Sequence, residues 1–252
     1  HPNSPVIMEP IFAIDMHVRA LSTASLGAMA NIMRATHLDE AIFASLCRES
    51  DMYHVLQRCA ILVSRMALTM PPPMFHDMVR ATASWPDLCR RLISTSATLS
   101  LARSRKLVAL GLAHMLRHAS AQDKGLLSAV PDMIGMWTEV VGEVVEDEAG
   151  SADRYERELS PTRALEIGED GIPFLDEFGL IEAAPTPSSA RTDAVRSRDP
   201  SFNVPLRAYV ADTLNAVLQN GSYKTQLQSL LATIDPLVLD TLQRGLSERP
   251  VA

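Results

Sequence analysis

Histidine and cysteine side chains are the groups of this sequence whose spacing could do chemistry. His114 and His118 stand four residues apart on an expected helix, a spacing that suits a metal ion. No third ligand accompanies them, and a zinc site needs three or four, so we predict surface or half-buried histidines. His54 lies near Cys47 and Cys59, but nothing orients its imidazole or makes the surroundings electropositive. We therefore expect no metal site, and we expect the cysteines to be reduced residues of the core.

Sequence motifs of common catalytic and nucleotide-binding sites are missing. The sequence contains no GxGxxG, GxxxxGK[ST], HExxH or GxSxG pattern. We accordingly predict that the chain is not an enzyme, has no catalytic residues and needs no cofactor. An all-α enzyme is the least favoured alternative, because no acid, base or metal-binding groups converge.

The net charge of −7 is unevenly distributed. Residues 139–182 hold fourteen acidic residues and three arginines, so the rest of the chain has 16 acids against 20 bases. The densest basic region carries no interleaved aromatic residues for base stacking, which makes nucleic acid an unlikely partner. That region comprises Arg90, Arg91, Arg103, Arg105 and Lys106. The acidic tract from Glu143 to Glu182 is the best candidate for a functional surface, and a soluble linker is an equal alternative.

Hydrophobic side chains recur every three or four residues along most of the chain, which predicts helices. From Met52 to Met70 the apolar positions form one face of a helix, which prolines 71–73 end. Thr36 and Asp39 have the spacing of a capping box, which predicts a helix start at Thr36. Arginines interrupt every apolar stretch, so we expect no membrane span. Further helices are predicted over 11–33, 74–83, 85–99, 100–119, 131–145, 206–218, 222–234 and 236–246.

Many helices joined by short turns fit either a globular bundle or a stack of helical hairpins. The stack is favoured, because helix pairs recur at about forty residues. We predict an all-α solenoid of HEAT-like hairpins, wound as a right-handed superhelix. It would hold repeats over 1–147, an acidic and then Pro/Ser-rich, partly disordered insertion over 148–198, and closing helices over 199–252, in one continuous domain.

The last third of the chain resembles a known family. Residues 196–210 read Arg-Ser-Arg-Asp-Pro-Ser-Phe-Asn-Val-Pro-Leu-Arg-Ala-Tyr-Val, and an Ile-Asp-Pro follows at 234–236. With the Arg-Lys-Leu-Val-Ala-Leu run at 105–110, this order is similar to the C-terminal end of importin-β-type karyopherins of the importin eleven branch and its fungal counterparts. The likeness covers about residues 85–248, and residues 1–84 fit by periodicity only.

The resemblance implies a nuclear transport receptor that shuttles between nucleus and cytoplasm and carries protein cargo through the nuclear pore. Such receptors release cargo when GTP-bound Ran binds, and they contact nucleoporins. The chain would be a C-terminal fragment, so Ran would act through the N-terminal repeats of the full-length receptor. The alternative is a free-standing HEAT-repeat scaffold that binds proteins without crossing the pore.

Candidate contact residues follow from the resemblance and from charge. Many cargoes are basic, so an acidic surface would attract them. The candidates for that surface are Glu146, Asp147, Glu148, Glu169, Asp170, Asp176 and Glu177. An apolar segment within the tract is predicted to dock back onto the solenoid as a tether or as a competitor of cargo. Its residues are Phe174, Leu175, Phe178, Leu180 and Ile181.

Overall fold

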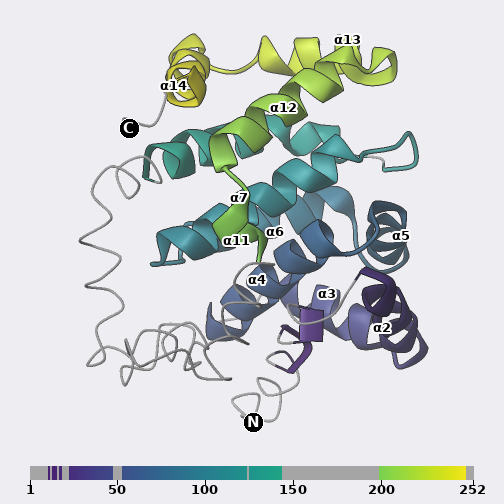
Figure 1. The fold of residues 1–252 in the computed structure, drawn as a ribbon. Helices are drawn as coiled ribbons and strands as arrows, with labels where there is room; N and C mark the ends of the chain where they lie inside the picture. Colours follow the sequence, from purple (N-terminus) through teal and green to yellow (C-terminus); the bar gives the residue numbers. More distant parts are fainter. Residues whose placement is uncertain are drawn as a thin grey trace, which may run out of the picture.

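The chain is helical through most of its described length. The computed structural model describes residues 11, 13–15, 17–18, 23–47, 53–123, 125–143 and 199–247, and none of these lies in a β-strand. The helices stack broadly in chain order, from α2 (Thr23–Ala35) at one end to α14 (Pro236–Ser247) at the other (Figure 1). The chain is thus an all-α solenoid, as the sequence predicts, in which each helical hairpin packs on its neighbours.

The hairpins repeat at a shorter spacing than expected. The first members of three successive pairs begin at residues 23, 53 and 85, so they are 30 and 32 residues apart rather than about forty. The reason is that turns of only two residues join α2 to α3, α4 to α5 and α5 to α6.

Residues 130–143 form a further helix beside the labelled elements. The bounds of the labelled elements are α2 Thr23–Ala35, α3 Leu38–Cys47, α4 Tyr53–Thr69, α5 Pro72–Thr82, α6 Trp85–Ser96, α7 Ala102–Arg117, η1 Leu127–Ala129, α11 Pro200–Asn203, α12 Leu206–Gln219, α13 Gly221–Leu231 and α14 Pro236–Ser247.

Prolines and a serine cap set the helix starts that the sequence indicates. Pro72 occupies the first turn of α5, where the missing backbone N–H has no helical partner in any case. At the next turn the Ser84 hydroxyl accepts a hydrogen bond from the backbone N–H of Asp87 and caps α6. These contacts confirm the breaks predicted at both positions.

The capping box predicted at Thr36 is wrong. The Thr36 hydroxyl donates to the carbonyl oxygen of Ile32 at 2.9 Å, so its side chain bonds the last turn of α2 instead of opening the next helix. His37 then adopts a positive φ of 55°, and α3 begins at Leu38. The turn between α2 and α3 has only two residues, so no separate residue is left to cap α3. The Thr36 hydroxyl therefore bonds carbonyl oxygens at the end of α2.

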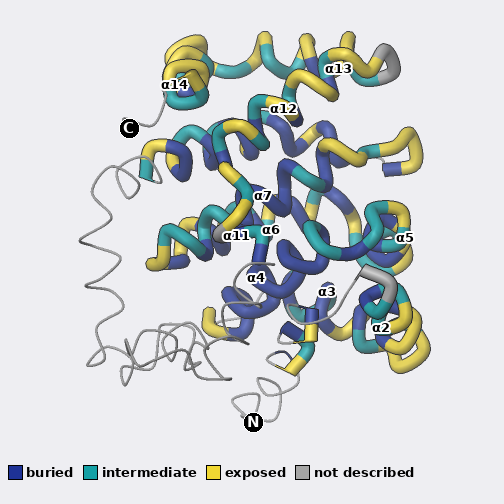
Figure 2. Tube along the Cα trace, in the orientation of Figure 1, coloured by how far each residue is buried: buried dark blue, intermediate teal, exposed yellow. Residues whose placement is uncertain are grey.

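Helices α4 and α7 form the centre of the core. The sequence predicts one buried face for α4, but every residue from Val55 to Ala67 is buried. The reason is that α3, α5, α6 and α7 all pack around it. Figure 2 shows this buried centre, with exposed residues gathered on the outer helices α2, α13 and α14.

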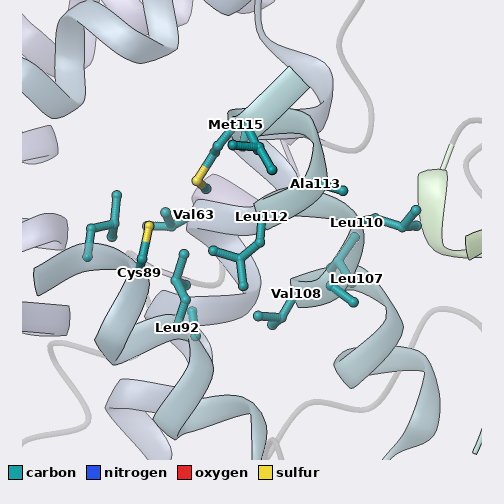
Figure 3. Packing of buried hydrophobic residues seen from close by; sticks show 14 of the residues in the cluster. Val63, Cys89, Leu92, Leu107, Val108, Leu110, Leu112, Ala113 and Met115 are labelled. Carbon is teal, nitrogen blue, oxygen red and sulfur yellow. The ribbon is translucent and has the colours of Figure 1, made fainter. Parts of the chain in front are cut away.

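The two central helices pack very closely where they cross. Figure 3 shows side chains of α4, α6 and α7, among them Val63, Cys89 and Leu112, packed together. Gly111 of α7 lies directly against Ser64 of α4, and a Cβ at Gly111 would stand 2.9 Å from the Ser64 Cα. Only a residue without a side chain fits this crossing.

The C-terminal helices cover one side of the core. Helix α12 packs along α7, and α13 and α14 pack in turn on α12 (Figure 1). The break predicted between the helices over 206–218 and 222–234 is confirmed at Asn220, because α12 ends at Gln219 and α13 already begins at Gly221. Leu227 is buried in α13 and Leu242 in α14, whereas Leu237 is 66% exposed. Burial therefore decreases towards this end of the stack.

Candidate functional site

The acidic and apolar residues predicted to contact partners lie outside the described residues. This holds for Glu146, Asp147, Glu148, Glu169, Asp170, Phe174, Leu175, Asp176, Glu177, Phe178, Leu180 and Ile181. Their roles stay predictions. The described part of the acidic tract ends at Glu143, which forms an ion pair with Arg105 of α7.

His114 belongs to a contact between α7 and α12. Its Nδ1 shares a hydrogen bond with the hydroxyl of Tyr209, while Arg117 lies 5.5 Å from the centre of the Tyr209 ring. The His118 ring is 4.4 Å from that of His114, measured between centroids. Burial lowers the pKa of His114 to about 4, with smaller contributions from His118, His76 and Arg117. No group of three potential metal ligands occurs among the described residues. His114 therefore joins α7 to α12, and His118 packs beside it on α7.

Acid should weaken the contact that His114 makes. Its pKa falls from 6.5 to about 4 in the folded state, so between these values the unfolded chain binds the extra proton. The free energy of unfolding should consequently rise with pH across this window. We expect His114→Asn, which leaves an amide near Tyr209, to flatten the rise in a urea-unfolding series.

His37→Asn is the matched control. The His37 ring is exposed, and its hydrogen bond with Glu40 raises its pKa, whereas the pKa of His114 is lowered. Asparagine also tolerates the positive φ of residue 37. This control should leave the His114-dependent rise in place. Equal flattening by both substitutions would contradict the assignment to His114.

The cysteines are packed within the fold. Cys59 and Cys89 are buried and Cys47 is half-buried, and none forms a disulfide. Burial raises the pKa of Cys59 and of Cys89 to about 12, so both are thiols at neutral pH. His54 is exposed at the start of α4. The prediction of reduced core cysteines is confirmed for Cys59 and Cys89.

Asp123 holds the loop that follows α7 against two earlier helices. Its carboxylate is fully buried and accepts hydrogen bonds from the side chains of His76, Arg80 and Trp85 at 2.9, 2.8 and 3.1 Å. It also accepts one from the backbone N–H of Ser120 at 2.7 Å. Burial alone would raise its pKa, but the bonds from Ser120 and His76 outweigh this and hold the pKa below the usual value. The carboxylate is thus charged and structural.

Asp123→Asn should destabilise the chain by about 1.5–3 kcal/mol, because an amide group would face donors that now bond a carboxylate. Urea unfolding at pH 7 measures the change. Asp77→Asn is the control, since Asp77 also bonds Arg80 but is exposed, and such a pair contributes about 0–1 kcal/mol. A similar loss of stability in Asp123→Asn and Asp77→Asn would show that Asp123 does not hold the loop against α5 and α6.

A buried arginine joins segments that are distant in the sequence. Arg65 of α4 donates from Nε to Asp15 at 2.8 Å and from a terminal nitrogen to Asp199, which caps α11. All three side chains are nearly inaccessible to solvent. Burial alone would lower the pKa of the guanidinium, but the two carboxylates outweigh this and raise it. The ion pairs therefore bind residues on both sides of the undescribed range 144–198 to one central helix.

An open groove of about 460 Å³ lies between α6 and the helix over 130–143. Its apolar lining comes from Ile93, Met136 and Val140, and Gly135 leaves space on one wall, where an added Cβ would meet no atom within 4 Å. The charged lining residues are Arg90, Arg105, Asp132 and Glu139. We call this the α6 groove. It brings together residues that the sequence does not single out as a site.

Four of the five basic residues of this region are engaged in contacts. Arg90 pairs with Asp87 at 2.9 Å, and Arg105 donates to Glu143 and to the carbonyl oxygen of Leu99. Arg103 and Lys106 also interact with other groups of the protein. The predicted basic cluster is thus not a continuous uncompensated surface. None of the described helices has the length and apolar character that crossing a bilayer requires.

The chain matches a known protein family. A family model described as importin-11-like TPR repeats matches residues 10–247 of the 252. No curated protein and no solved structure matches the chain.

Proposed function

The chain belongs to the importin-11-like TPR-repeat family, and we propose that it is the cargo-binding part of a nuclear transport receptor. The observation that carries this proposal is the family match over residues 10–247 of a chain built as a solenoid. A stack of hairpins presents a long surface that suits protein partners better than small substrates. The proposed role is binding and release, without catalysis.

Release would depend on Ran. In this proposal the full-length protein binds cargo on one side of the nuclear pore and sheds it when GTP-bound Ran binds. The protein would accordingly shuttle between nucleus and cytoplasm and contact nucleoporins during passage. The α6 groove and the acidic tract are the two surfaces of this chain proposed to take part.

The acidic tract is proposed to increase the rate at which basic cargo associates. Residues 139–182, which include the tract, hold fourteen acidic residues and three arginines, whereas the rest of the chain has an excess of basic residues. Clustered charge accelerates association with an oppositely charged partner, and salt reduces the effect. Capture of cargo should therefore be weaker at high ionic strength.

The test uses the full-length protein that carries this sequence, purified from cell extract with its bound proteins. We expect GTP-loaded Ran to release a defined set of them and GDP-loaded Ran to retain them. A variant with Glu146, Asp147 and Glu148 changed to amides should capture less basic protein. The charge-matched control changes Glu40, Asp212 and Asp240, which are exposed on described helices.

Equal retention under GTP-loaded and GDP-loaded Ran would contradict the transport role. Such a result, with partners still bound, would favour the free-standing scaffold. Equal loss of capture in the acidic variant and its control would contradict the role of the tract alone.

A further inference from the structure

The groove beside α6 has features of a binding surface for one kind of partner. Its volume of about 460 Å³ falls within the range of ligand pockets, about 300–1,000 Å³. However, it is open rather than enclosed, so it suits side chains that project from another protein better than a small molecule. Its accessible apolar lining comes from Ile93, Ala97 and Pro131, whereas Met136 and Val140 beneath are buried in the core.

The two carboxylates of the groove lack an ion-pair partner among the described residues, whereas its two arginines each have one. Among the described residues, Arg90 is paired with Asp87 and Arg105 with Glu143. Asp132 and Glu139, by contrast, are exposed on the wall of the groove and have no ion-pair partner in the described part of the chain. The groove therefore offers two carboxylates above an apolar lining.

The two carboxylates lie on one face of a helix. Asp132 and Glu139 are seven residues apart, which places them on the same side two turns from each other, about 10 Å along the axis. Between them Gly135 leaves the wall open, because an added Cβ would meet nothing within 4 Å. A partner's side chain can enter at this point.

We propose that the α6 groove binds a basic amphipathic helix of a partner protein. Apolar side chains of that helix, at the spacing of i, i+3, i+4 and i+7, would contact Ile93, Ala97 and Pro131, the apolar lining residues that are not buried. Its lysine or arginine side chains would meet Asp132 and Glu139. This inference rests on the proposed protein-binding role and names the class of partner.

The test measures binding of synthetic helical peptides to the chain by fluorescence anisotropy. The probe is a peptide with leucines at the anchor spacing and lysines on the flanks; two comparison peptides carry glutamate for lysine, or serine for leucine. We expect the basic amphipathic peptide to bind and both comparison peptides to bind at least about tenfold more weakly, because both kinds of contact contribute.

Gly135→Leu fills the groove without touching the packed core, since the space above Gly135 is empty. We expect it to weaken peptide binding at least about tenfold. Gly142→Leu is the matched control, because it lies on the same helix, is also open above its Cα and does not line the groove. It should leave binding unchanged.

Removing one carboxylate tests the charge contact. Glu139→Gln should weaken peptide binding about two- to fivefold, and the control Asp212→Asn on α12 should leave binding unchanged.

Three results would overturn the proposal: no binding of the basic peptide, equal binding of the acidic peptide, or equal affinity in Gly135→Leu and Gly142→Leu. The last result would place the peptide outside the groove. The peptide assay contains no Ran, so its outcome is independent of the transport role. Ran-dependent release that is unaffected by Gly135→Leu would leave transport standing and refute the groove.

Discussion

Replacing Arg65 by methionine should cost the chain about 3–5 kcal/mol of folding free energy. The substitution keeps an apolar stem of similar length but removes the positive charge that Asp15 and Asp199 now contact inside the protein. Two buried carboxylates would lose their shared cation, and a charge left in a dry interior is strongly unfavourable. The midpoint of urea unfolding at pH 7 measures the loss.

Arg244→Met is the matched control for this substitution. Arg244 also pairs with an aspartate, Asp240, at 3.0 Å, but both side chains are 63% exposed. An exposed pair contributes about 0–1 kcal/mol, so the control should barely change the midpoint. If Arg65→Met were no more destabilising than Arg244→Met, the buried ion pairs would not hold the solenoid together. Adding Asp15→Asn to Arg65→Met should recover part of the loss, because it removes one unpaired charge.

Gly111→Leu should destabilise the chain by at least about 3 kcal/mol, the upper end of the usual cost of overpacking. The new Cβ alone would stand 2.8 Å from the Ser64 Cβ and 2.9 Å from its Cα, so α4 and α7 must separate. These helices share an extensive contact at the centre of the core, and their separation disturbs the core on both sides. Thermal and urea unfolding would report the change.

Gly142→Leu provides the comparison, since the same substitution there meets no atom within 4 Å. A helical glycine is less favourable than other helix formers, so this variant should be neutral or up to about 1 kcal/mol more stable. We therefore expect Gly111→Leu to lower the free energy of unfolding and Gly142→Leu to leave it unchanged or raise it. A stable Gly111→Leu variant with native helix content would show that the close crossing is not required.

Local patterns were sufficient to predict the helices and several of their ends. The apolar stripe of α4, the proline start of α5 and the Asn220-Gly221 break all follow from periodicity and from residues with strong backbone preferences. The same patterns misplaced Thr36, because a two-residue turn gave its side chain to the preceding helix. Sequence neighbours alone do not show which of two helices a hydroxyl will bond.

The polar contacts that join distant segments could not be predicted. Arg65 looks like a surface residue in the sequence, and its partners Asp15 and Asp199 are 50 and 134 residues away. Asp123 likewise sits in a polar loop whose sequence gives no sign of the donors from α5 and α6. Gly111 looks like a weak helix position rather than a crossing point, because the neighbouring helix is not adjacent in the sequence.

The α6 groove could not be predicted from the sequence either, because its two walls come from helices that the core brings together. The contact residues predicted from charge lie in the acidic tract, beyond the described ranges, and they stay predictions. The groove and the tract both offer carboxylates, and a single basic partner could engage them together. The Gly135→Leu and acidic-tract variants separate the two contributions.

The most direct test of the central claim is the distribution of the captured proteins in cells. The full-length protein that carries this sequence would be depleted acutely, and the nuclear-to-cytoplasmic ratio of each captured protein would be measured by fluorescence microscopy. We predict that this ratio changes promptly for the proteins that GTP-loaded Ran releases and stays constant for the others. Unchanged ratios for all captured proteins after depletion would contradict a transport role.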